Sequence, residues 1–254
     1  MFRIFSLEFL LVLTLLAVPA AADFEFDFET SHYRVVTTNQ NFDDAAAAAV
    51  ATQFNGIAGS LARIDSQAEN DAIAAALFAN ISPSEFSNTV APDGGGGSYV
   101  WLGGTDRDSE GVWIWDGDGD GVGDQFWAGD EDGSAVGGLY NTFGTTASQN
   151  EPDNFGAGQD GLGISLNGWP LGSASQWNDV SDANDLYFLI EFENANPMCL
   201  LGDVNLDGEV NLLDVSSFVT AVTRGTFSCE ADANEDGNVD LLDVAPFVML
   251  LTGQ

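Results

Sequence analysis

Acidic and amide side chains recur near the C-terminus with a spacing suited to calcium. Residues 203–225 and 232–253 share the pattern D-x-N-x-D-G-x-V-x-L-L-D-V. Calcium takes roughly six to eight oxygen ligands, and a twelve-residue loop supplies them from positions 1, 3, 5, 7, 9 and 12. The pattern therefore predicts two Ca2+ sites. The predicted ligands are Asp203, Asn205, Asp207, the Glu209 carbonyl, Asn211 through water and Asp214 in the first loop, and Asp232, Asn234, Asp236, the Asn238 carbonyl, Asp240 through water and Asp243 in the second.

The surroundings of these loops differ from those of an ordinary EF-hand. Gly208 and Gly237 fall at loop position 6, where the sharp turn needs a positive φ. Helices are expected after each loop, at 215–222 and 244–251, and none before it. The last ligand is Asp rather than Glu. Tandem loops of this kind resemble type I dockerins over residues 199–254, which implies a small all-α calcium-loop domain, placed here at 195–254.

The dockerin resemblance also implies a docking role, with a cohesin-like or cell-surface protein as the candidate partner. Cohesin-binding dockerins often carry polar residues at loop positions 10 and 11 and basic residues along the helix. Here these positions hold Leu212-Leu213 and Leu241-Leu242, and Arg224 is the only base in the module. The calcium-dependent fold is therefore expected to carry over, while cohesin recognition is not.

The two cysteines of the chain, Cys199 and Cys229, precede the two loops by four and three residues. A disulfide between them would close a loop of about thirty residues, which the chain-entropy model credits with roughly 3–4 kcal/mol. Two free thiols are the alternative. For an exported chain with an even, symmetrically placed pair, we expect the disulfide.

Residues 23–194 are expected to form a separate α+β domain. Helices are predicted at 41–54, capped by Asn41, and from the capping box Ser66-x-x-Glu69 toward Asn80. Short strands are predicted at 99–102 and 112–115, and a closing strand at 186–192. A long Gly/Asp/Asn-rich stretch up to Gln176 shows little periodicity, and a loop of that length is usually functional or organised by metal.

The order of motifs in this domain resembles a C-type lectin. The matching motifs span nearly the whole domain. The resemblance implies a C-type lectin-like fold with a long loop region. They are His32-Tyr33, Phe42, Leu61-Ala62-Arg63-Ile64, Ser66 to Asn70, Val100 to Gly104, Trp113 and Trp115, Tyr140 to Phe143, Glu151-Pro152-Asp153-Asn154, Trp177-Asn178-Asp179 and Phe188 to Phe192.

The last motifs hold a second set of oxygen ligands. A cis peptide before Pro152 would turn the side chains of Glu151 and Asp153 to the same side, and Asn178 and Asp179 add oxygens from the next strand. In the resembled family this group holds one Ca2+, whose open coordination positions accept two vicinal sugar hydroxyls. By the same resemblance Gln159 is the fifth ligand. The sugar's predicted hydrogen-bond partners are Glu151, Asp153, Gln159 and Asn178.

Two departures from the family pattern bear on this site. Asp153 stands where the family usually has Asn, and Gln159 where it usually has Glu. The two changes offset each other in charge, so calcium binding is expected to survive. Sugar specificity does not carry over, because Asn and Asp differ as hydrogen-bond donors and acceptors. The family's disulfides are absent from this domain, which has no cysteine.

A third acidic stretch runs from Asp116 to Asp124 as D-x-D-x-D-G-x-x-D. Its glycine at position 6 suits a calcium loop, but Trp127 occupies the twelfth position. Glu131 or Asp132 would have to complete the ligand set. A calcium loop and a solvated hairpin tip both remain open.

Charge and the N-terminus limit the classes of function. The formal charge is −35, without a single lysine, so the chain should repel nucleic acid and anionic membrane surfaces. Arg3, the apolar run 9–18 and the A-x-A site at Ala20–Ala22 predict a signal peptide over residues 1–22. The mature chain is then expected to be secreted or at the cell surface, with no transmembrane segment.

Three classes of function compete. An enzyme is the weakest, because the single histidine, His32, lies in a family strand and the paired carboxylates are accounted for as metal ligands. No nucleophile or phosphate-loop motif is present. The best reading is a secreted, non-enzymatic, calcium-dependent lectin that binds glycan and carries a docking or anchoring tail. The alternative is an extracellular structural or matrix protein that uses both domains for protein contacts.

Overall fold

The computed structural model describes residues 22–147, 149–156, 158–195, 200–225, 228–234 and 238–252. The predicted signal peptide lies outside the described residues, except for its last residue. Below, the head is residues 22–195 and the tail is residues 200–252. Their buried apolar side chains form separate core clusters, two in the head and one in the tail.

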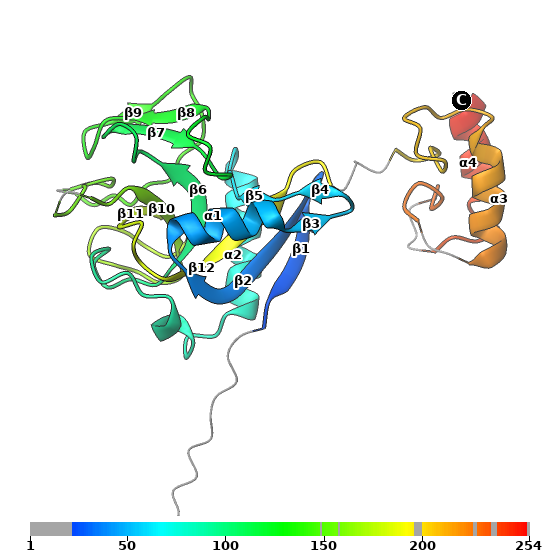
Figure 1. The fold of residues 1–254 in the computed structure, drawn as a ribbon. Coiled ribbons are helices and arrows are strands. Elements are labelled where there is room, and N and C mark those ends of the chain that lie inside the picture. Colours follow the sequence, from blue (N-terminus) through cyan, green and yellow to red (C-terminus); the bar gives the residue numbers. More distant parts are fainter. Residues whose placement is uncertain are drawn as a thin grey trace, which may run out of the picture.

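The head is an α+β unit, as expected, and its described residues form a ten-stranded sheet and a separate two-stranded sheet (Figure 1). Strand β12 (Leu186–Phe192) lies between β2 (Ser31–Gln40), to which it is antiparallel, and β6 (Tyr99–Thr105), to which it is parallel. The first and last long strands of the head are therefore neighbours. The remaining strands are β1 (Phe24–Phe28), β3 (Gln53–Phe54), β4 (Ile57–Ala58), β5 (Ser60–Leu61), β7 (Val112–Trp115), β8 (Gln125–Ala128), β9 (Ser134–Ala135), β10 (Gly161–Ser165) and β11 (Trp177–Val180).

Every residue of β12 is buried, because both faces of the sheet are covered. Successive side chains of a strand point to opposite faces. Phe188 and Ile190 join the cluster that contains the buried residues of helix α1 (Phe42–Ala51). Tyr187 and Leu189 join the cluster that contains Ile73 and Leu77 of helix α2 (Gln67–Asn80). The apolar run Leu186 to Ile190 follows from that two-sided burial, and Glu191 is the one charged residue of the strand.

Both head helices begin at the predicted caps. The Asn41 side chain accepts the amide of Asp44 at 2.9 Å, and the Ser66 hydroxyl accepts the amide of Glu69 at 3.1 Å. The prediction that the first helix extends to residue 54 is wrong, since α1 ends at Ala51 and residues 53 and 54 form β3. A single 3-10 turn, Phe86–Asn88, follows α2.

The long stretch up to Gln176 is more ordered than predicted. It contains β8, β9 and β10, and β11 begins at Trp177. These strands are short or glycine-rich, so their sequences show no clear alternation. Their aromatic side chains pack on the central core instead. Trp177, for example, makes edge-on contacts with Trp115 and Phe126.

The tail contains two helices, α3 (Asp214–Arg224) and α4 (Val244–Thr252). Each follows an acidic loop, at nearly the predicted position. Phe218 and Phe247 stack face to face with ring centroids 3.8 Å apart. With Ala231 and Val239 they are the buried apolar residues of the tail core. Within the part of the chain that the structure describes, no helix has the length and apolar character of a membrane span.

Candidate functional site

The structure brings three predicted ligands of the head together. Carboxylate oxygens of Glu151, Asp153 and Asp179 lie within 4.8 Å of one another. Glu151 and Asp153 flank Pro152 in the long loop, and the Glu151–Pro152 peptide is cis, as predicted. Asp179 lies on β11, which holds it against that loop. A loop and a strand therefore supply one compact group of oxygens.

Hydrogen bonds fix the positions of these carboxylates. Asp179 is fully buried, and its two oxygens accept the amides of Asp153 at 3.2 Å and Asn154 at 2.7 Å. Glu151 is 3% exposed, and its Oε1 accepts the indole N–H of Trp169 at 2.8 Å. The group is thus held in place by protein donors on one side.

Two buried oxygens beside this group have no hydrogen-bond partner among the described residues. They are Oε2 of Glu151 and Oδ1 of Asn178. Asn178 is 2% exposed, and its Nδ2 donates to the Tyr99 hydroxyl at 3.0 Å, which leaves its oxygen as the free end. An unsatisfied buried acceptor is costly and needs an explanation. A cation that takes oxygen ligands would satisfy both atoms.

The electrostatics of the group also favour a cation. Burial, together with the charge of the neighbouring Asp153, raises the pKa of Glu151 to about 7, and the hydrogen bond from Trp169 limits this rise. Burial, followed by the charge of Glu151, raises the pKa of Asp179 well above its ordinary value. The carboxylates repel one another in a site shielded from water. A divalent ion would remove that repulsion.

Gln159, the fifth predicted ligand, has its oxygen engaged elsewhere. It is 2% exposed, and its Oε1 accepts the amide of Phe155. Its Nε2 donates to the carbonyl oxygen of Asp93 at 3.3 Å. Gln159 therefore lies at the site, but in the structure its oxygen braces the loop and is not an open ligand position.

A cavity of about 340 Å³ opens beside these residues. Its polar lining includes Glu151, Asp153, Gln159 and Asn178. The lining also includes the apolar side chains of Phe155, which is 70% exposed, Trp169, Pro170 and Leu171, together with the loop at 92–95. The cavity thus combines oxygen-bearing and apolar side chains.

Two residues that position the site were missed by the sequence reasoning. Trp169 anchors Glu151, as described above. Asp93 accepts the amide of Ser181 at 2.6 Å and the side-chain amide of Asn184 at 2.7 Å, which ties the loop at 92–95 to the end of β11. The Asp93-Gly94 pair is a turn signal, but its contacts are far away in the sequence.

In the first tail loop, the residues at the two ends are buried. Asp203 is 5% exposed and Asp214 is fully buried. Asp203 accepts the amides of Asp207 at 3.0 Å and Gly208 at 2.8 Å, and Asp214 accepts those of Asn205 at 3.0 Å and Asn211 at 2.9 Å. Gly208 has the predicted positive φ, +87°.

The second tail loop repeats this arrangement where it is described. Asp243 is fully buried and accepts the amides of Asn234 at 3.2 Å and Asp240 at 2.7 Å. Asp232 is also buried, and Asn238 lies within the described residues. Asp236, Gly237 and Cys199 lie outside them, so the sixth position of this loop and the Cys199–Cys229 disulfide remain predictions.

Carboxylate oxygens are not gathered in the tail as they are in the head. Among the described residues, only two sets of three acidic side chains have oxygens within 4.8 Å of one another, and both belong to the head. In the tail, the loop's own amides occupy the oxygens of Asp203 and Asp214. The described tail ligands are therefore held by the amides of their own loop and do not form a carboxylate cluster.

The second head set is Asp116, Asp118 and Asp120 of the third acidic stretch. Asp124 is not part of it, because its carboxylate pairs with Arg63 at 2.7 Å. Asp116 is buried, but Asp118 and Asp120 are exposed. The oxygens of Asp116 accept amides of the same loop. The arrangement leaves both readings of this stretch open.

No protein-family model matches the sequence, and a search among curated proteins finds no match. Solved structures do resemble it. The C-type lectin CEL-I from Cucumaria echinata is 21% identical, with a TM-score of 0.44, over 70% of this chain and 99% of that chain. The mouse scavenger receptor C-type lectin carbohydrate-recognition domain is 23% identical, with a TM-score of 0.41, over 66% and 93%. Human lithostathine is 17% identical, with a TM-score of 0.41, over 66% and 96% of the two chains.

Proposed function

We propose that the head is a C-type lectin-like domain that binds one Ca2+ ion and, through it, a neutral glycan with vicinal hydroxyls. One observation carries the proposal. The unpartnered oxygens Glu151 Oε2 and Asn178 Oδ1 are buried beside a cluster of carboxylates. A bound Ca2+ ion would pair both oxygens and offset the negative charge. It would also present open coordination positions to hydroxyl oxygens.

The character of the site supports a neutral ligand of modest affinity. The cavity is lined by apolar side chains, including Phe155, as well as by the oxygens. Asp153 is an acceptor-only side chain, so the site favours hydroxyls that donate hydrogen bonds. The formal charge of −35 disfavours acidic glycans.

Calcium titration and glycan binding of the full chain test this proposal. We expect saturable calcium binding in the head and calcium-dependent glycan binding that free sugar competes. Asp179→Ala should abolish both, and Asp179→Asn should weaken both strongly. The matched control is Asp185→Ala, which removes an exposed aspartate of the same domain and should leave both intact.

Two results would contradict the proposal in different ways. If Asp179→Ala binds as many calcium ions as the wild type, the proposed metal site of the head does not exist. Normal calcium binding without any glycan competed by free sugar would remove the lectin activity and leave the alternative, a head used for protein contacts.

We further propose that the tail is a dockerin-like module that binds calcium and docks the secreted protein onto another protein. The support is the repeated exposure of apolar side chains at positions 10 and 11 of both loops. Leu212 and Leu213 are 81% and 69% exposed, and Leu241 and Leu242 are 79% and 66% exposed. Side chains of this size in equivalent places of two repeats suit a protein contact.

Replacing all four leucines with serine tests the docking role. We expect the wild type to attach to a cell surface or matrix and to be released from it by chelator. The variant should keep the calcium response of the tail but should no longer attach. Attachment that survives the four substitutions would exclude these leucines from docking.

A further inference from the structure

A second cavity of the head, about 690 Å³ in volume, shares no lining residue with the calcium-site cavity. It is bordered by the β1–β2 turn, the start of α2, the end of β7 and the end of β12. Its lining has one basic residue, Arg63, and six acidic ones, namely Glu29, Asp65, Glu69, Asp118, Glu191 and Glu193. The cavity is therefore strongly negative.

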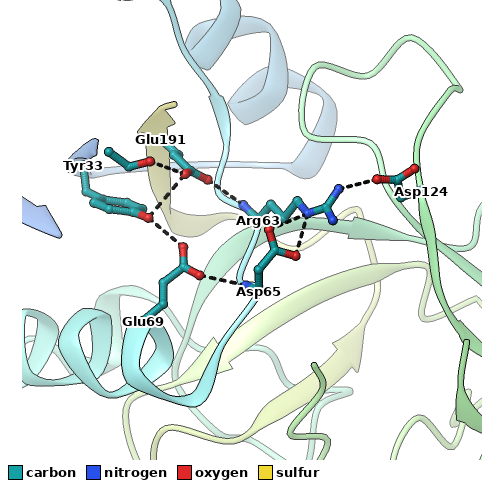
Figure 2. A network of polar contacts seen from close by, with 7 residues as sticks. Tyr33, Arg63, Asp65, Glu69, Asp124 and Glu191 are labelled. Atoms are coloured by element: carbon teal, nitrogen blue, oxygen red, sulfur yellow. Dashed lines mark hydrogen bonds and ion pairs between the residues drawn. The ribbon is translucent and has the colours of Figure 1, made fainter. Parts of the chain in front are cut away.

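Arg63 does not neutralise the buried part of this charge. Its guanidinium pairs with Asp65 at 2.8 Å and with Asp124 at 2.7 Å. Figure 2 shows its side chain directed to these two aspartates, while only its backbone amide meets Glu191. Within the described part of the chain, no ion pair includes Glu69 or Glu191.

Glu69 and Glu191 are held beside each other on one wall. Each is 8% exposed. The Tyr33 hydroxyl lies between them, 2.7 Å from Glu69 Oε1 and 3.3 Å from Glu191 Oε1 (Figure 2). Two carboxylates this close and this buried are unfavourable without a cation. Burial raises the pKa of both carboxyl groups, because the charged form is unfavourable away from water.

The shape and chemistry of the wall suit an organic cation better than a metal ion. Glu69 accepts the amide of Asp65 at 2.8 Å, and Glu191 accepts the Ser31 hydroxyl at 2.8 Å and the amide of Arg63 at 3.1 Å. These donors occupy part of the oxygen shell that calcium needs. Neither glutamate belongs to a described set of three carboxylates with oxygens within 4.8 Å.

The cavity is also far larger than an ion requires, and aromatic residues line it. Phe28, Tyr33 and Trp115 take part in the lining. Aromatic faces attract ammonium and guanidinium groups, and they also pack against aliphatic stems. A charged group at the two glutamates with an apolar stem along this wall fits both features.

We propose that this cavity binds an organic cation, an ammonium or guanidinium group on an aliphatic stem, with Glu69 and Glu191 as its counter-charges. Such a group is carried by the lysine and arginine side chains of a partner protein and by free polyamines. The negative field of the whole chain would draw either one to the cavity.

Calorimetric titration of the full chain at pH 8 in calcium tests this site. The probes are Nα-acetyl-lysine N-methylamide for a protein side chain and 1,5-diaminopentane for a polyamine. Nα-acetyl-norleucine N-methylamide, which keeps the stem but lacks the charge, is the matched control. We expect one equivalent of a cationic probe to bind and the norleucine probe not to bind. The tighter probe identifies the source of the cation.

Variants then locate the site. Glu191→Gln and Glu69→Gln keep the shape of the side chain and should each weaken binding by about tenfold or more, since a hydrogen bond to a charged group is lost. Glu131→Gln removes one exposed charge outside the cavity and should change affinity less than about twofold. Asp179→Asn, at the proposed calcium site, should leave cation binding intact.

The proposal is overturned if neither cation binds saturably, or if the norleucine probe binds equally well. If Glu131→Gln and Glu191→Gln weaken cation binding equally, the binding depends on the overall charge of the chain and not on this cavity. If one equivalent of calcium displaces the cationic probe, and Glu191→Gln abolishes this competition, the cavity is a metal site instead. Near-ultraviolet circular dichroism checks that each variant is folded. If one of the two glutamate variants does not fold, the other is enough to test the proposal.

Discussion

The head and the tail are both rich in acidic residues, yet they depend on different forces. The head buries three tryptophans almost completely, Trp101, Trp113 and Trp177, and covers both faces of its sheet. Among the described residues of the tail, the buried apolar core comprises four side chains, including Phe218 and Phe247. A core that small does not hold a fold without another stabilising term.

The two proposed kinds of calcium site differ accordingly. In the tail, ligands come from twelve consecutive residues of one loop, as in Asp203 to Asp214. In the head, Glu151 and Asp179 come from separate segments that the folded sheet holds together. Metal binding should therefore create the fold of the tail, whereas the fold of the head should create its metal site.

The largest expected effect is the loss of tail structure on calcium removal. Chelator should abolish the helical signal and the amide protection of α3 and α4, because the acidic loops repel one another without the ion. The head should stay folded. All six tryptophans lie in the head, so their fluorescence reports on it alone, while hydrogen exchange of 214–224 and 244–252 reports on the tail.

Variants sharpen this prediction. Asp203→Ala combined with Asp232→Ala should eliminate the calcium response of the tail. Glu209→Ala is the matched control, since position 7 contributes its backbone carbonyl and the response should persist. Unchanged exchange in α3 and α4 on chelation would show that the tail does not need the ion.

The next largest effect is expected in the head core. Trp177→Ala should lower the free energy of unfolding of the head by about 3–5 kcal/mol, because it removes a large, fully buried ring. It also leaves the Asn70 side-chain oxygen without its 2.9 Å bond from the indole. Urea unfolding followed by the remaining tryptophans measures the change.

Phe155→Ala is the control for that experiment. Phe155 is 70% exposed, so its removal should change stability little while it weakens glycan binding. If Trp177→Ala were as mild as Phe155→Ala, stability of the head would not rest on this core, and the contrast with the tail would fail.

A smaller effect is expected from pH acting on the buried pair in the head. Burial raises the pKa of Glu191 to about 7 from its ordinary 4.5, so folding favours the protonated form. The stabilisation from proton uptake is present below about pH 4.5 and is lost as pH rises through about 7. Glu191→Gln should therefore flatten the pH dependence of stability between pH 5 and 8, by an amount on the order of 3 kcal/mol.

The measurement is urea unfolding of the head at both pH values. Glu69, whose pKa is also raised, and the site carboxylates contribute to the wild-type slope, so the difference between wild type and variant is decisive. Asp185→Asn, at an exposed aspartate of the head that does not contribute to the raised pKa of Glu191, should keep the wild-type slope. Identical slopes for all three proteins would exclude Glu191 as the source.

The smallest expected effect concerns the start of the helices. Asn41→Ala removes the side-chain cap of α1 and should cost the head about 1 kcal/mol. Leu213 is the N-cap residue of helix α3 and makes no side-chain cap bond, so Leu213→Ala should not show a comparable loss. Thermal unfolding of both variants in calcium gives the comparison, and equal losses would contradict it.

The sequence by itself determined the local features of this protein. The caps at Asn41 and Ser66, strands β7 and β12, helices α3 and α4 and the turn at Gly208 appear at or near the predicted residues. Each depends on neighbours a few residues apart, such as the Asp203–Gly208 contact. Spacing along the chain is enough to reveal interactions of that range.

Tertiary structure alone decided the rest. Strands β8, β9 and β10 escaped the sequence reasoning. Strands β8 and β9 are only four and two residues long, and the glycine-rich β10 pairs with β6, which is far along the chain. Asp93 and Trp169 brace the calcium site, and Glu69 meets Glu191 through Tyr33, only because the sheet brings distant segments together. Burial then sets their chemistry, since a carboxylate loses its water only once the surrounding chain has packed over it.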